Sequence, residues 1–144
     1  MARATRRGPR GNALVEFVLV LPLLFLILAA ILDWGWYFFV REVVTNASRQ
    51  GARVGSAAVS EAVARADAVT AARTYLGRAL GSGYAIDPDV AAAACSAGGY
   101  RCITVSFTDY PVVAGRADTT LSGFGTLTRA PTSLTVQSQM RLER

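Results

Sequence analysis

The sequence contains no histidine and no lysine, so all 15 of its basic residues are arginines. The absence of histidine removes the commonest general base of enzymes. No serine or cysteine stands in a nucleophile motif, no Walker sequence occurs, and the Gly-Ser-Gly at 81–83 lacks the third glycine of a dinucleotide-binding loop. Asp87 and Asp89 flank Pro88, a pattern typical of a turn. The sequence therefore predicts no catalytic residues, no cofactor and no small-molecule substrate.

Acidic side chains are few as well, and the formal net charge is +5. Four arginines precede Gly11, so the charge of the remainder is 5 − 4 = +1. These arginines are Arg3, Arg6, Arg7 and Arg10. A chain with its excess positive charge at one end has no basic patch of the kind that binds a phosphate backbone. We predict no nucleic-acid partner.

Apolar residues are in excess, at 52% of the chain, and many of them form one run. No charged residue occurs between Phe17 and Leu32, and aromatic residues follow Asp33. At about 1.5 Å per residue, a helix over 13–39 is long enough to cross a hydrocarbon core of roughly 30 Å. The aromatic residues at 34, 36 and 37 suit the far interface, and the N-terminal arginines indicate a cytoplasmic N-terminus. The sequence predicts a membrane-spanning helix over 12–40 and an extramembrane domain over 41–144.

Cleavable export signals do not explain this run. The apolar stretch continues through the aromatic residues, and no small-x-small site closes it. The twin arginine at 6–7 is followed by Gly-Pro-Arg, where that export signal prefers apolar residues. We therefore expect the helix to be retained.

Glu16 interrupts the start of the apolar run. An ionised carboxylate at mid-bilayer costs on the order of 2.5–3.5 kcal/mol, and less near the end of a span. Either Glu16 lies at headgroup level near Arg10, or a partner offsets its charge.

Pro22 removes one helical hydrogen bond, so it either kinks the helix or is tolerated within it. Asp33 either marks the outer interface or makes a polar contact between subunits.

Several short motifs in the first third of the chain resemble one protein family. They are a basic leader that ends in Gly11, then Val15-Glu16-Phe17, Leu21-Pro22, Asp33-x-Gly35, and Asn46-Ala47-x-Arg49-x-Gly51-Ala52-Arg53. The combination resembles the TadE-like pseudopilins of the tight-adherence (Flp) pilus, which belong to the type IV pilin-like proteins. The strand-like ending Met-Arg-Leu-Glu at 140–143 is also similar to the end of many TadE-like chains.

The resemblance implies a prepilin-type leader over 1–11 and a cut by a prepilin peptidase between Gly11 and Asn12. It also implies that Glu16 and Phe17 register subunits, with the carboxylate of Glu16 neutralising the new ammonium of an adjacent subunit. Phe17 stands where the short major pilins usually carry tyrosine, and this chain is longer than they are. A minor or accessory subunit is therefore expected rather than the main filament component.

The implied partners are the prepilin peptidase, other pilin or pseudopilin subunits, the pilus assembly platform and the bacterial inner membrane. The protein would be a single-pass protein with its C-terminal domain in the periplasm, and it would enter an extracellular pilus or remain in a complex at its base. The alternative is an uncleaved envelope protein whose periplasmic domain binds another protein. Cleavage after Gly11 discriminates between the two.

Beyond the membrane, the patterns predict an α+β domain with a pilin-like layout. Apolar residues at three-and-four spacing after Val40 extend the first helix to about Val59, with a possible break at 55–56. A second helix is predicted over 60–80, with Ser60 at its start and glycines after its end. Alternating residues at 102–110 and 133–143 predict strands of a small antiparallel sheet, joined by a long loop that contains at most a short strand.

The two cysteines, Cys95 and Cys102, enclose Ser-Ala-Gly-Gly-Tyr-Arg. On the side of the membrane predicted to be oxidising, they favour a disulfide that closes a small loop. A disulfide across so short a loop contributes at most about 2 kcal/mol. No metal site is predicted, because histidine and a second thiol pair are both lacking.

Overall fold

The computed structural model describes residues 10–94, 100–114 and 120–142. Along the chain it contains α1 (Arg10–Ser56), α2 (Glu61–Leu80), a 3-10 turn η1 (Ser82–Tyr84), β1 (Asp89–Ala94), β2 (Arg101–Pro111), α3 (Gly125–Thr128) and β3 (Ser133–Arg141). The α+β class and the pilin-like layout predicted from the sequence are confirmed.

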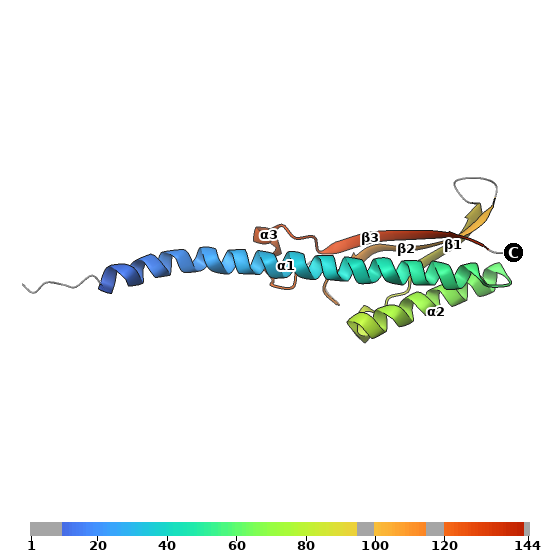
Figure 1. Cartoon of the computed structure of the whole chain (residues 1–144), viewed down its shortest axis with the longest axis horizontal. Helices are drawn as coiled ribbons and strands as arrows, with labels where there is room; N and C mark the ends of the chain where they lie inside the picture. Colours follow the sequence, from blue (N-terminus) through green and yellow to red (C-terminus); the bar gives the residue numbers. More distant parts are fainter. Residues whose placement is uncertain (1–9, 95–99, 115–119, 143–144) are drawn as a thin grey trace, which may run out of the picture.

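The longest element, α1, runs for 47 residues, or about 70 Å at 1.5 Å per residue. Its N-terminal half projects alone, whereas its C-terminal half lies between α2 and the sheet (Figure 1). The projecting half is apolar on all sides, and the packed half has the three-and-four spacing of an amphipathic helix. The two halves of α1 therefore suit different environments: the N-terminal half suits apolar surroundings, and the C-terminal half suits the surface of a folded domain.

The core forms where the C-terminal half of α1 meets both other layers. Its members are buried apolar residues, mostly small on the helices and larger on the strands. They include Val40, Val43, Val44, Ala47 and Ala52 of α1, Ala64, Ala68, Ala72 and Leu76 of α2, and Ile103, Val105, Phe107, Tyr110 and Leu134 of the sheet. The small side chains let the two helices approach closely while the sheet fills the remaining volume.

Gly51 and Gly55 make that approach possible. A Cβ at Gly51 would lie 2.9 Å from the carbonyl oxygen of Ala68, and one at Gly55 would lie 2.8 Å from that of Ala64. Both distances are shorter than real Cβ contacts allow. The two glycines, four residues apart, thus bring α1 against the backbone of α2 within this chain.

The boundaries of α2 follow the predicted caps. Ser60 has an extended backbone and its side chain accepts a hydrogen bond from the Val63 N–H, while Gly81 ends the helix with φ of 98°. That φ favours glycine, because a Cβ disfavours the left-handed region. The first helix ends at Ser56, where the sequence indicated a break.

The sheet is antiparallel with strand order β1-β2-β3. Ile103, Val105 and Phe107 face the helices, and an irregularity between Phe107 and Tyr110 then shifts the alternation by one residue. Asp109 has φ of 49° at this bulge. The shift turns Tyr110 back into the core, where its hydroxyl donates to the carbonyl oxygen of Tyr84.

Two elements differ from the sequence-based prediction. The segment around Asp89 was interpreted as a turn, but Asp89–Ala94 forms β1 and pairs with β2 from Asp89–Ser106 to Ala94–Arg101. Within residues 112–114 and 120–132, the described part of the loop between the predicted strands, the chain forms the short helix α3 and no strand. In both places tertiary contacts override weak local preference.

Candidate functional site: the apolar half of α1 and the loop clasped to it

The N-terminal half of α1 has almost no protein around it. We call residues 13–32 the anchor segment. Its large apolar side chains are mostly exposed, up to 74% for Leu19. The described chain has one helix long and apolar enough to cross a membrane, with a mean hydropathy of 2.9 in its most apolar window and only 6% of that window buried. A core helix of a soluble protein would be mostly buried, so this exposure is consistent with a membrane anchor.

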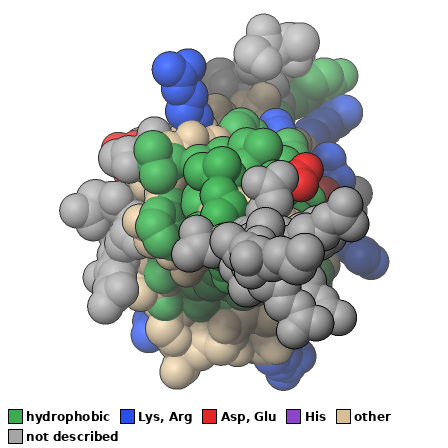
Figure 2. Space-filling model, turned by 90° about the vertical axis from the view of Figure 1, so that its left-hand side faces the viewer, with side chains coloured by type: hydrophobic (Ala, Val, Ile, Leu, Met, Phe, Trp, Pro, Cys, Tyr) green, Lys and Arg blue, Asp and Glu red, His purple; other side chains and the backbone are tan. Residues whose placement is uncertain are grey.

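Figure 2 looks at the molecule from the N-terminal end of α1. Hydrophobic side chains gather in the middle of this view, and arginines lie mainly at its margin. An apolar surface of this extent is unfavourable in water and favourable in lipid or against other apolar helices. We therefore expect lipid or other apolar helices to surround this end of the molecule.

Glu16 is the single charged residue of the anchor segment. Its side chain is exposed, and it makes no hydrogen bond or ion pair with another residue of the described chain. Phe17 beside it is 59% exposed. The backbone of Gly11 and Asn12 belongs to the first turns of α1. The predicted cleavage and registration residues thus lie together at one end of the helix, and their roles stay predictions.

Pro22 lies inside α1, which continues as one helix on both sides of it. The predicted kink at Pro22 stays a prediction. Its ring does line an open apolar groove of about 340 Å³, described below. The proline therefore belongs to the surface that a neighbour of the anchor would meet.

Asp33 directly follows the anchor segment and binds a loop that is distant in the sequence. It is 2% exposed. One carboxylate oxygen accepts from the backbone N–H of Ser122 at 2.7 Å. The other accepts from the hydroxyls of Ser122 at 2.7 Å and Thr128 at 2.8 Å. The side chain of Thr120 also hydrogen-bonds to this carboxylate, so donors from three residues of one loop converge on Asp33 and tie the loop to α1.

The two tryptophans after Asp33 extend this attachment. The indole N–H of Trp34 donates to the carbonyl oxygen of Thr128 at 3.2 Å, and that of Trp36 donates to Val112 at 2.8 Å. The sequence predicted these aromatics as residues of a membrane interface. In the structure each also satisfies a backbone carbonyl of the C-terminal part of the chain.

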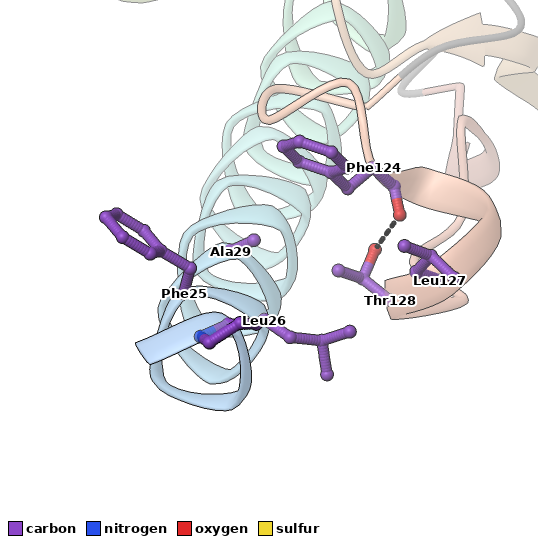
Figure 3. Close-up of a pocket in the computed structure, with 7 residues that line it drawn as sticks. Phe25, Leu26, Ala29, Phe124, Leu127 and Thr128 are labelled. Atoms are coloured by element: carbon purple, nitrogen blue, oxygen red, sulfur yellow. Dashed lines mark hydrogen bonds between the residues drawn. The ribbon is translucent and has the colours of Figure 1, made fainter. Parts of the chain in front are cut away.

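The loop tied to Asp33 forms one wall of the apolar groove. Phe124, Leu127 and Thr128 face the anchor residues Pro22, Phe25, Leu26 and Ala29. Figure 3 shows Leu26 extended toward the side of α3. Sequence reasoning missed this loop. The signal in the sequence is the spacing of three between Leu121, Phe124 and Leu127 within an otherwise polar, glycine-rich stretch.

Other predicted sites are described only in part. Cys102 is buried at the start of β2, but Cys95 lies outside the described residues, so their disulfide stays a prediction. Most of the predicted leader also lies outside them. Within residues 10–94, 100–114 and 120–142, no three His, Cys, Asp or Glu side chains group as metal ligands would.

Residues 11–53 match the family model described as TadE-like protein. The chain therefore contains a TadE-like segment. The match covers nearly all of α1, including the anchor segment, Asp33 and the two glycines packed on α2. No curated protein and no solved structure matches the chain.

The TadE-like match and the structure divide the chain at different points. The match ends at residue 53, whereas packing on α1 begins at Asp33 and involves α2, the sheet and the α3 loop. The family segment thus contains both the exposed anchor and the face on which the C-terminal domain packs. The recognised part of the sequence is the helix around which the remainder of the protein is arranged.

Proposed function

We propose that this TadE-like protein is a pseudopilin, or minor pilin, that takes part in assembly of a tight-adherence (Flp) pilus. The observation that carries the proposal is the family match over a helix with one unburied apolar half and one packed half. Such a helix can be surrounded by lipid before assembly and by the apolar helices of other subunits after it. The domain on its other half remains folded in both situations.

We further propose that a prepilin peptidase cuts the chain between Gly11 and Asn12. The family match begins at residue 11, which supports a boundary there. Residues 1–11 would be the leader, 12–40 the membrane-spanning helix, and 41–144 the periplasmic domain. The partners would be the peptidase, other pilin-like subunits and the assembly platform in the inner membrane.

Glu16 would then pair with the ammonium that the cut creates on Asn12 of a neighbouring subunit. An unpaired carboxylate within apolar surroundings is costly, by roughly 2.5–3.5 kcal/mol at mid-bilayer. Pairing it with an ammonium offsets much of that cost and fixes the axial position of one helix against the next. The lack of an ion-pair partner for Glu16 within the described chain supports a partner from outside it.

The first experiment determines the N-terminus and intact mass of the full chain after membrane extraction, from cells with and without an active prepilin peptidase. We expect an N-terminus at Asn12 only when the peptidase is present. A known peptidase substrate expressed in the same cells serves as the control. A retained leader in both samples, with the control substrate cut, would contradict processing and favour the uncleaved envelope protein.

The second experiment tests Glu16. Glu16→Ala should insert in the membrane normally but co-purify poorly with other pilin-like subunits. Taking the mid-bilayer cost as an upper bound, its association should weaken by up to about two orders of magnitude. Val15→Ala is the matched control, because Val15 is the adjacent exposed residue and carries no charge. Equal recovery of subunits with both variants would refute the pairing.

A further inference from the structure

The loop that carries α3 extends back along α1, toward the anchor and away from the sheet (Figure 1). The anchor segment has 20 residues, which as a helix span about 30 Å, the thickness of a hydrocarbon core. Asp33 would then lie at its boundary. The groove residues Phe25 and Ala29 precede Asp33 by eight and four residues, so they lie about 12 Å and 6 Å deeper. The opposite wall of the groove, formed by Phe124 and Leu127, therefore reaches below the boundary.

Several polar groups of this loop have hydrogen-bond partners within the protein. Ser122 and Thr128 donate to the carboxylate of Asp33, and the Thr128 hydroxyl also lies 3.3 Å from the carbonyl oxygen of Phe124 (Figure 3). The N–H groups of Leu127 and Thr128 bond to the carbonyl oxygen of Phe124, and the carbonyl of Thr128 accepts from Trp34. Non-helical backbone is tolerated at membrane depth where it is buried against protein, and the bonds to Asp33 and Trp34 hold the backbone of this loop against α1.

The apolar side chains of the loop are directed outward. Leu121, Phe124 and Leu127 are 50%, 57% and 62% exposed, and Phe124 and Leu127 line the groove together with exposed side chains of the anchor. Arg129, just after α3, is exposed and is long enough to reach lipid phosphates at the boundary. A loop with the hydroxyls of Ser122 and Thr128 inside and its leucines and phenylalanine outside has the opposite polarity to a loop in water.

We propose that the loop over 120–128 is a membrane-embedded wedge, and that the groove between α3 and α1 is filled by phospholipid acyl chains of the leaflet on the side of the domain. The proposal rests on the membrane anchoring proposed above. Lipid is favoured over a second copy of the chain because the groove is continuous with the anchor surface that the same leaflet surrounds. The wedge fixes the depth and tilt of α1, since the domain then contacts the bilayer at two points.

The test uses the full chain in vesicles of phosphatidylcholine and phosphatidylglycerol. A ketone-bearing amino acid is incorporated at one position at a time and coupled to a nitroxide, which leaves both cysteines untouched. The labelled positions are Leu127, Phe25 as the lipid reference, and Val59, which is 91% exposed between α1 and α2, as the water reference. Electron spin resonance then measures collisions with oxygen, which concentrates in lipid, and with a water-soluble nickel complex.

We expect the ratio of oxygen to nickel collisions at Leu127 to match Phe25 and to exceed that at Val59 by at least several-fold. A ratio at Leu127 equal to that at Val59 would overturn the wedge. Protection of Leu127 from both probes would also overturn it, because a protein partner would then cover the groove. If Phe25 itself behaved like Val59, the anchor assignment would fail together with the wedge, so the two failures are distinguishable.

Discussion

Replacing Asp33 with alanine removes the carboxylate that holds the α3 loop against α1. The loss affects three hydrogen bonds of 2.7–2.8 Å, from the backbone and hydroxyl of Ser122 and from the hydroxyl of Thr128, together with one from the side chain of Thr120. A hydrogen bond to a charged group contributes about 1.5–3 kcal/mol. The donors regain water once the loop opens, so the effects do not sum fully. We expect the free energy of opening this loop to fall by about 3–5 kcal/mol.

Hydrogen exchange of the detergent-solubilised full chain measures this directly. Every 1.4 kcal/mol is a factor of ten, so amides of residues 120–130 should exchange roughly two to three orders of magnitude faster in Asp33→Ala. Exchange in α2 and β2 should change little, because neither depends on Asp33. Asp87→Ala is the control: it breaks an exposed ion pair with Arg73, at 3.3 Å, that contributes less than about 1 kcal/mol. Unchanged exchange over 120–130 in Asp33→Ala would refute the reasoning, and so would an equal increase throughout the domain.

Two further predictions concern the packed domain. Gly55→Ala brings a Cβ within 2.5 Å of the Ile103 Cδ1 atom and should destabilise the domain by about 1–3 kcal/mol. Gly77 lies in the interior of α2, and a Cβ there would have no neighbour closer than 3.6 Å, so Gly77→Ala should stabilise the domain by about 0.5–1 kcal/mol. Thermal unfolding of the two variants in one detergent compares them, and the opposite order would contradict the glycine argument. Burial raises the pKa of Tyr110 above its ordinary value near 10, so the unfolded chain loses this proton at a lower pH than the folded chain does. The free energy of unfolding should therefore fall above pH 10, by up to about 1.4 kcal/mol per pH unit. Tyr110→Phe should lower the free energy of unfolding at neutral pH by about 1 kcal/mol, because a hydrogen bond is lost, and its stability should fall less steeply above pH 10. Urea titrations at pH 7 and above pH 10 measure both effects. An equally steep fall in stability in Tyr110→Phe would contradict the role of Tyr110.

The helices were predictable because their signals are local. The length of α1 follows from a continuous apolar run that passes into three-and-four spacing, and the ends of α2 follow from Ser60 and Gly81. Each of these signals lies within a few residues of the boundary it marks. The TadE-like resemblance was predictable for the same reason, because its motifs lie within one helix.

The strand β1 was not predictable in this way. Four of its six residues are alanines, which favour helices when no tertiary contact decides. Its conformation comes from pairing with β2 along its whole length and from its contact with α2. The sequence of 89–94 alone contains neither partner, so the local pattern indicated only a turn at its start.

The attachment of the α3 loop to Asp33 shows what single-sequence reasoning needs in order to find such a site. Asp33 has hydrogen-bond partners 89 and 95 residues away in the chain, so no local pattern links them. Both partners nevertheless depart from the usual local pattern. Asp33 is an acid directly after an apolar run, and the polar loop contains three large apolar residues at a spacing of three. An acid that ends an anchor needs donors, and an apolar loop needs a non-aqueous surface. Because both requirements are met by bringing the loop to the apolar half of α1, the two exceptions taken together indicate the contact that neither indicates alone.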